Sequence, residues 1–290
     1  MANFEIFTDS CCDLPKKLVE QCNIQVLQLE VNIDGKPPVL NKDIESKDFY
    51  EQLRKGANAK TSAVTPGCVE EHMRKSLEEG KDIIYLGFSS GLSVTYQNAV
   101  MMMSELQDEY PERVIKQVDT LCASVGQGLL VYYAANLRNE GASIDEVFEK
   151  IMAVKDNIHH VVTVDDLFFL KRGGRLSAVS AITGSLLKVK PIIIIDESGH
   201  LINVATVRGR RNALKDLYER MRHSQDFEKL GYVFISHADC IEDAQYLQTM
   251  INEEYPKVQV VLSDIGPVIG AHTGPGGLAM CFLGKTVKGN

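Results

Sequence analysis

The 290-residue chain lacks several features that would assign it to a class of protein at once. Its start, MANFEIFTDSCC, has no basic region and no long apolar segment, and its most apolar run, KPIIIID, is far too short to span a bilayer. Lys and Arg number 31 against 39 Asp and Glu, so the chain has no basic surplus for binding nucleic acid. We therefore expect a cytoplasmic globular protein with no signal peptide, no membrane span and no nucleic-acid partner.

Motifs for metals, disulfides and phosphoryl transfer are also missing. The seven cysteines form no CxxC pair, and Cys11 and Cys12 are adjacent, which favours reduced thiols over a disulfide framework. Asp165 and Asp166 have no His or further acid at a suitable spacing for a metal. The chain has neither a P-loop nor the set of protein-kinase motifs. We therefore predict no metal, no cofactor and no phosphoryl transfer by this chain itself.

The first half of the chain alternates short apolar segments with amphipathic ones. Strands are predicted at residues 3–9 and 81–88, and a helix at 94–109. A helix over 13–22 is expected to have Asp13 as its cap, and Ser143 forms a capping box with Glu146. This alternation is typical of a parallel sheet with helices on both faces.

The pattern changes near residue 158. Strands at 190–196 and 200–209 flank the turn signal Glu-Ser-Gly, which predicts an antiparallel pair. The segment 265–281 has five glycines and two prolines and is expected to be a loop. The predicted class is α/β: a three-layer α/β/α domain with a parallel sheet over 1–158, then an α+β domain over 159–290.

The segment GFSSG, residues 87–91, matches the G-x-S-x-G pattern of a nucleophile elbow between a strand and a helix. Ser89 would then be the nucleophile of an esterase or lipase, with Asp264 and His272 following in the required order. However, no HGGG-type segment precedes Ser89, and too few predicted strands come before it for that fold. This hydrolase interpretation stays open as the alternative.

The same turn also has the composition of a site that holds an anion without reacting with it. Ser90, Gly91 and Ser93 stand at the start of a helix, where free N–H groups and the helix dipole attract negative charge. Thr61 and Ser62 form a second hydroxyl-rich segment before a helix. Simple helix capping explains one of these hydroxyls but not all of them.

Cationic side chains occur in two further segments. Lys171, Arg172 and Arg175 surround two glycines, and Arg208, Arg210 and Arg211 lie where a predicted strand meets a helix. Arginine on such a backbone suits a carboxylate or a phosphate. The imidazole of His272 lies between glycines in an uncharged segment, which favours a functional role over that of an ordinary surface histidine.

Six segments, taken in order, resemble the DegV family of fatty-acid-binding proteins. They are TDSCCDLP, TSAVTPG, SSGLSVTYQNA, FLKRGGRLS, VKPII and IGPVIGAHTGPGGLA. The family includes the lipid-carrying B subunit of bacterial fatty acid kinase, and the similarity extends over essentially the whole chain. Val94 stands where the family commonly has Gly, beside Ser93.

The resemblance implies a fold with a lipid tunnel at the domain junction and assigns the site residues. The fatty-acid carboxylate would be bound by Thr61, Ser62 and Ser93. An acyl-phosphate head group would lie near the cationic or imidazole side chains of Arg172, Arg208 and His272, with Ser90, Gly91 and Gly274 as supporting turn residues.

The implied function is that of a carrier. The chain would bury one long-chain fatty acid, such as palmitate or stearate, and present its carboxylate to a separate ATP-dependent kinase. The acyl phosphate would then pass toward phospholipid synthesis, with transient contact to a membrane or an acyltransferase. About 14 methylenes at ~0.8 kcal/mol each give roughly 11 kcal/mol of apolar burial before entropic costs, so tight binding needs no covalent bond.

Overall fold

A computed structural model describes residues 3–175, 189–224 and 226–289. The first sheet has the strand order β2-β1-β6-β7, and all of its neighbouring strands are parallel. Its members are β1 (Phe4–Asp9), β2 (Ile24–Leu27), β6 (Asp82–Gly87) and β7 (Ile115–Asp119). The chain runs to one side of β1 to form β2 and later to the other side to form β6, so the carboxyl ends of β1 and β6 flank a topological switch point.

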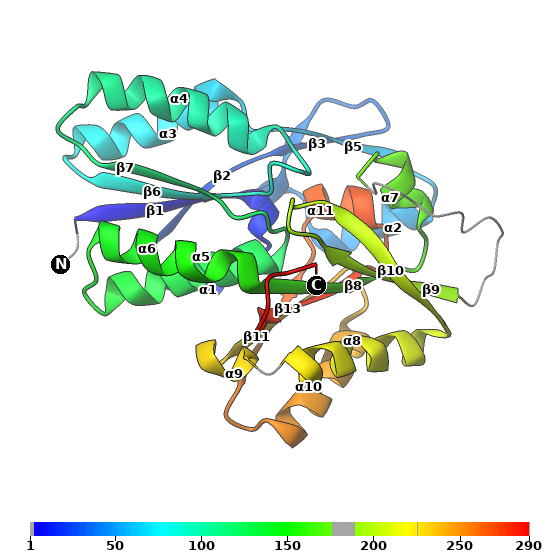
Figure 1. The fold of residues 1–290 in the computed structure, drawn as a ribbon. Helices are drawn as coiled ribbons and strands as arrows, with labels where there is room; N and C mark the ends of the chain where they lie inside the picture. The colour runs from blue at the N-terminus through cyan, green and yellow to red at the C-terminus, as the bar shows by residue number, and fades with distance from the viewer. Residues whose placement is uncertain (1–2, 176–188, 225, 290) are drawn as a thin grey trace.

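Helices cover both faces of this parallel sheet (Figure 1). Phe7, Ile83 and Tyr85 pack under α3 (Pro66–Glu78) and α4 (Thr95–Glu109). Ile6 and Ile84, one residue away, point to the opposite face, as period-2 alternation requires. That face is covered by α1 (Lys16–Gln21), α5 (Val125–Asn139) and α6 (Ile144–Val154).

The second sheet has six strands in the order β10-β9-β8-β13-β11-β12, and only β11 and β12 are parallel within it. Its strands are β8 (Ile158–Thr163), β9 (Val189–Ile195), β10 (Leu201–Arg208), β11 (Tyr232–His237), β12 (Gln259–Asp264) and β13 (Leu278–Leu283). On one face lie α8 (Arg210–Ser224), α9 (Phe227–Leu230) and α10 (Ile241–Glu254). Helix α5 packs on the other face, so it is shared by the two large sheets.

A third, smaller sheet lies beyond the carboxyl end of β1. It has the order β4-β3-β5 and consists of β3 (Glu30–Ile33), β4 (Val39–Leu40) and β5 (Ala59–Ser62). The helices around it are α2 (Ser46–Arg54), α7 (Phe168–Arg172) and α11 (Pro267–Thr273). Three short 3₁₀ turns complete the described elements: η1 (Ser10–Cys12), η2 (Asn41–Asp43) and η3 (Lys155–Asn157).

Several sequence predictions are confirmed. The 94–109 helix is α4, Ser143 and Glu146 make the capping box of α6, and β9 and β10 form the antiparallel pair. The chain is α/β with one parallel sheet and a second, mixed sheet. Because β8 begins at Ile158 but α5 packs on both sheets, the division into domains at 158/159 stays a prediction. In the described part of the chain, no helix has both the length and the apolarity to cross a membrane.

Two predictions about local structure are wrong. Asp13 does not cap α1, because its side chain is buried and accepts hydrogen bonds from Ser124 and Gly266 instead. The segment 265–281 is not a loop, because it forms α11 and the start of β13. The glycines fall at the turn between these two elements, where Gly274 and Gly276 both have positive φ.

Candidate functional site

A cavity of about 540 Å³ lies between the parallel sheet and the six-stranded sheet. Cys11, Phe88 and Ser124 reach it from beyond the carboxyl ends of β1, β6 and β7. Open α/β sheets bind ligands at this edge, beside the switch point, because loops from neighbouring strands meet there. The opposite wall is built by the strands β8, β9, β10 and β13 of the six-stranded sheet.

Most of the cavity wall is apolar. The volume lies in the range of about 300–1,000 Å³ that is usual for small-molecule sites. The wall on the six-stranded sheet carries branched and small side chains: Val162, Ile193, Ile195, Leu201 and Ala279. The remaining apolar lining comes from the parallel sheet, α7 and α11, and includes Leu29, Ala63, Phe88, Leu92, Val94, Ala123, Leu170, Ile265, Val268 and Ile269.

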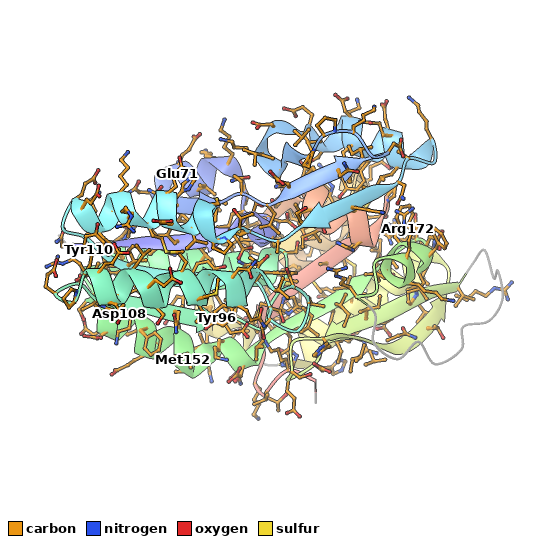
Figure 2. The ribbon with its side chains drawn as sticks, turned by 90° about the horizontal axis from the view of Figure 1, so that it is seen from above. Glu71, Tyr96, Asp108, Tyr110, Met152 and Arg172 are labelled. Carbon is orange, nitrogen blue, oxygen red and sulfur yellow. The ribbon has the colours of Figure 1, made fainter. Side chains whose placement is uncertain are left out.

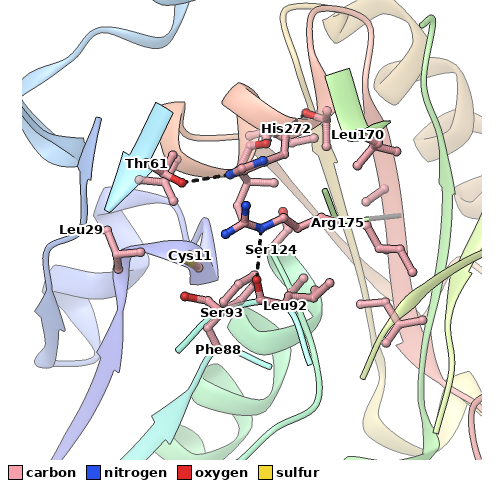
Figure 3. Close-up of a pocket in the computed structure, with 18 of the residues that line it drawn as sticks. Cys11, Leu29, Thr61, Phe88, Leu92, Ser93, Ser124, Leu170, Arg175 and His272 are labelled. Atoms are coloured by element: carbon pink, nitrogen blue, oxygen red, sulfur yellow. Dashed lines mark hydrogen bonds between the residues drawn. The ribbon is translucent and has the colours of Figure 1, made fainter. Parts of the chain in front are cut away.

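Polar groups gather at one end of this cavity (Figure 3). The hydroxyl of Thr61, on β5, lies 2.9 Å from Nε2 of His272 on α11. Ser93, in the turn before α4, accepts a hydrogen bond from the Thr95 amide at 3.1 Å and lies 2.9 Å from the Thr95 hydroxyl. The guanidinium of Arg175 points into the space between Thr61 and Ser93.

Arg175 is held there by backbone oxygens. Its Nε donates to the carbonyl of Leu92 at 3.3 Å, and its Nη1 donates to the carbonyl of Gly173. Gly173 is needed because a Cβ at this position would collide with Nδ1 of His272. The close packing of the 171–175 segment on α11 therefore places a guanidinium and an imidazole at the same end of the cavity.

The electrostatics of this end favour an anion. Burial, together with the positive charges of Arg175 and Arg172, lowers the pKa of His272 to about 4, so the imidazole is neutral at pH 7. Nδ1 of His272 is buried without a hydrogen-bond partner among the described residues. Arg175 is the one Lys or Arg among the described lining residues, and that lining includes no Asp or Glu. One uncompensated cation in an apolar cavity attracts a carboxylate or phosphate.

The structure brings together five of the predicted site residues. Thr61, Ser62, Ser90, Ser93 and His272 all line the cavity, although they come from segments more than 200 residues apart. Arg175 also lines the cavity, but it was not among the predicted site residues, although its cationic segment 171–175 stood out in the sequence. The signal that would have found it is the Gly-Gly pair, which allows the chain to turn back toward His272.

Four other predicted residues do not line the cavity. Arg172 is exposed on α7 and its guanidinium stacks on Phe168 and Phe169, so it lies on the outside of the molecule (Figure 2). Arg208 is exposed at the end of β10. Gly91 and Gly274 shape the two adjoining turns, and their predicted supporting role is untested, as are the roles of both arginines toward a phosphate. Ser177 of the KRGGRLS motif lies outside the described residues.

The geometry around Ser89 does not fit a nucleophile. Its side chain is fully buried, its hydroxyl donates to the carbonyl of Gly199 at 2.8 Å, and it accepts from the amide of Gly91. Ser89 also lacks the positive φ of a strained elbow. His272, the proposed base, pairs with Thr61, and Asp264 lies near His237 instead. The hydrolase interpretation therefore has no support at this serine.

No metal site is evident at the cavity or elsewhere in residues 3–175, 189–224 and 226–289, where no group of three His, Cys, Asp or Glu side chains could hold an ion. The fold and the site together define an α/β protein with two large sheets and, between them, a largely apolar cavity whose lining includes one guanidinium and no described carboxylate. A family model described as "Uncharacterised protein, DegV family" matches residues 3–285. The chain belongs to the DegV family.

Relatives of known sequence and structure agree in length and fold. The chain is 43% identical to a DegV domain-containing protein of Clostridium perfringens, over 99% of each chain. A Bacillus subtilis structure described as DegV, a fatty acid binding protein, is 30% identical, with a TM-score of 0.83 over 98% of this chain and 100% of that one. A Thermotoga maritima structure described as a DegV lipid binding protein is 28% identical, with a TM-score of 0.86 over 99% and 100%.

Proposed function

We propose that this protein binds one long-chain fatty acid in the cavity and carries it without chemical change. The observation that carries the proposal is the lining itself: it is mostly apolar, it includes the guanidinium of Arg175, the hydroxyls of Thr61 and Ser93 and the neutral imidazole of His272, and it has no carboxylate among its described residues. An amphipathic anion matches this lining, because its apolar tail suits the apolar walls and its charged head group suits the polar side chains. The solved relatives described as fatty-acid- or lipid-binding proteins support the same ligand class.

Burial of the tail supplies the affinity, and the polar end removes the penalty of burying the head group. Each methylene taken from water contributes about 0.8 kcal/mol. A buried carboxylate without partners would be costly and would be protonated instead. Arg175 and the hydroxyls of Thr61 and Ser93 offer charge-assisted hydrogen bonds that offset this cost.

The double variant Thr61→Val with Ser93→Ala is expected to bind palmitate about 100-fold more weakly than the wild type. Each hydroxyl would give one hydrogen bond to a charged oxygen, worth about 1.5 kcal/mol or more. Titration calorimetry or displacement of a fluorescent fatty acid measures the affinity. Thr249→Val, which removes a hydroxyl from the surface of α10, is the matched control. An unchanged affinity in the double variant would contradict the placement of the carboxylate.

We further propose that the bound acid is presented to a separate ATP-dependent fatty acid kinase, and that the acyl phosphate then passes toward phospholipid synthesis. Outside the cavity, Arg172 lies close enough to His272 to lower its pKa, and Arg208 is exposed at the end of β10. Neither arginine forms an ion pair with a described acidic side chain. A phosphate added to the carboxylate would bring more negative charge, which the guanidinium groups of Arg172 and Arg208 would attract.

Arg208→Ala is expected to slow acyl-phosphate formation about tenfold while leaving palmitate affinity unchanged, because Arg208 lies outside the cavity. The measurement uses a purified fatty acid kinase catalytic subunit and ATP, with hydroxylamine to trap the acyl phosphate. Lys215→Ala, which removes an exposed cation from α8, serves as the control. Equal rates for wild type and Arg208→Ala would exclude Arg208 from the presentation step.

A further inference from the structure

Asp13 is a buried carboxylate between the two large sheets, just beyond the carboxyl end of β1. It is 8% exposed and has a φ of 47°. One oxygen, Oδ1, accepts a hydrogen bond from the amide of Gly266 at 2.9 Å, and Oδ2 accepts from the hydroxyl of Ser124. Its backbone carbonyl accepts from the hydroxyl of Ser263 at the end of β12. Asp13 therefore contacts both halves of the chain.

The first of these contacts fixes the start of α11. Gly266 directly precedes this helix, and the next free amide, that of Val268, donates to Oδ1 of Asn41 at 2.9 Å. Two side chains from the first half of the chain thus satisfy amide groups that a helix leaves unpaired at its start. Since α11 has only seven residues, the position of its first turn determines where His272, in its last turn, meets Thr61.

The second contact fixes the wall of the cavity. Ser124 lines the cavity and has φ 49° and ψ −139°, a conformation that costs a non-glycine residue energy. Its hydroxyl is held by Asp13 and lies 2.9 Å from the hydroxyl of Ser236. The surrounding structure must stabilise this backbone, and the Asp13 side chain contributes by accepting a hydrogen bond from the Ser124 hydroxyl.

Keeping a carboxylate here is costly. Burial raises the pKa of Asp13 to about 8 despite the hydrogen bonds from Ser124 and Gly266, and the charges of Asp264 and Asp9 raise it as well. An apolar side chain would fill the space without this penalty. The two oxygens of Asp13 have different partners: Oδ1 accepts from the residue before α11, and Oδ2 accepts from Ser124 in the cavity wall. This arrangement links the helix that carries His272 to the wall of the cavity.

We propose that Asp13 is a positioning residue for the head-group end of the cavity. It fixes the positions of α11 and Ser124 relative to each other, so that His272 and Thr61 are placed to contact the ligand carboxylate. This inference rests on the proposed fatty acid binding. Asp13 itself is not among the residues that line the cavity, so it acts through its partners.

The test compares a fatty acid with an alcohol of the same chain length. Palmitate and hexadecanol share the tail but not the charged head group, so a positioning defect affects the acid selectively. Asp13→Ala is expected to weaken palmitate binding about tenfold and hexadecanol binding less than threefold. Asp13→Asn, whose Oδ1 can still accept from Gly266, is expected to recover part of the palmitate affinity.

A second variant breaks the same contact without changing a charge. A Cβ at Gly266 would lie 2.9 Å from Oδ1 of Asp13 and 3.2 Å from Nδ2 of Asn41, and the φ of −67° there is ordinary for any residue. Gly266→Ala is therefore expected to reproduce the selective loss even if Asp13→Ala fails to fold. Gly67→Ala, where a Cβ would meet nothing within 4 Å, is the matched control.

The outcomes separate the two proposals. Equal losses for palmitate and hexadecanol in both Asp13→Ala and Gly266→Ala would overturn the positioning role, because the carboxylate would then only stabilise the fold. A wild-type protein that binds neither ligand would overturn the proposed function instead. In that case the imidazole resonances of His272, followed by NMR in the ligand-free protein, still test Asp13: they should shift in Gly266→Ala and not in Gly67→Ala, and unshifted resonances would refute the proposal.

Discussion

Arg175→Ala is expected to lower palmitate affinity by about 30-fold, because it removes the one guanidinium that lines the described part of the cavity. The ligand carboxylate would lose a charge-assisted hydrogen bond worth about 2 kcal/mol. The loss should be much smaller for hexadecanol, which carries no charge. Titration calorimetry with both ligands measures the difference directly.

Two matched variants serve as controls for Arg175→Ala. Arg172→Ala removes a guanidinium three residues earlier, from the outside of α7, and should change the affinity by less than threefold. Arg175→Lys keeps the charge but not the planar fork, so an intermediate affinity is expected. If Arg172→Ala has the larger effect, the head group lies outside the cavity and the assignment of Arg175 is wrong.

Ala279→Phe is expected to shorten the fatty acid that the protein accepts. Ala279 lies on β13 and is 5% exposed, and it lines the cavity from the six-stranded sheet, in one apolar cluster with Val162 and Ile193. A phenyl ring there would displace about four methylenes of the tail, so palmitate affinity should fall by about 3 kcal/mol, or more than 100-fold.

A series of ligands separates this effect from unfolding. Decanoate has a shorter tail and should bind to Ala279→Phe nearly as well as to the wild type. Overpacking is expected to cost about 1–3 kcal/mol of stability, which thermal unfolding measures. Val204→Phe, at a side chain that is 41% exposed on β10, is the control. A uniform loss across all chain lengths would show that the tail does not reach Ala279.

The sequence allowed the parallel sheet and the hydroxyl end of the cavity to be predicted, because both depend on local patterns. The strands β1 and β6 are short apolar runs, and Thr61 and Ser93 stand in hydroxyl-rich segments beside helices. His272 was predicted for a similar reason, since an isolated imidazole among glycines is unusual.

The errors came from features that depend on distant contacts. Asp13 has the sequence position of a helix cap, yet its carboxylate accepts a hydrogen bond from the amide of Gly266, more than 250 residues away. Arg172 and Arg175 are equivalent by composition, and only the packing of Gly173 on His272 decides which guanidinium enters the cavity. Strand β13 was missed because its flanking glycines mark a turn, while its pairing with β8 and β11 is non-local.

The position of β13 has a consequence for the order of events during biosynthesis. This strand comes last among the described strands, yet it lies between β8 and β11 in the middle of its sheet and contributes Ala279 to the cavity wall. Until β13 has been synthesised and has left the ribosome, the sheet has a gap where β13 belongs and the cavity wall is incomplete. Binding of a lipid in the completed cavity therefore has to wait until β13 has joined β8 to β11.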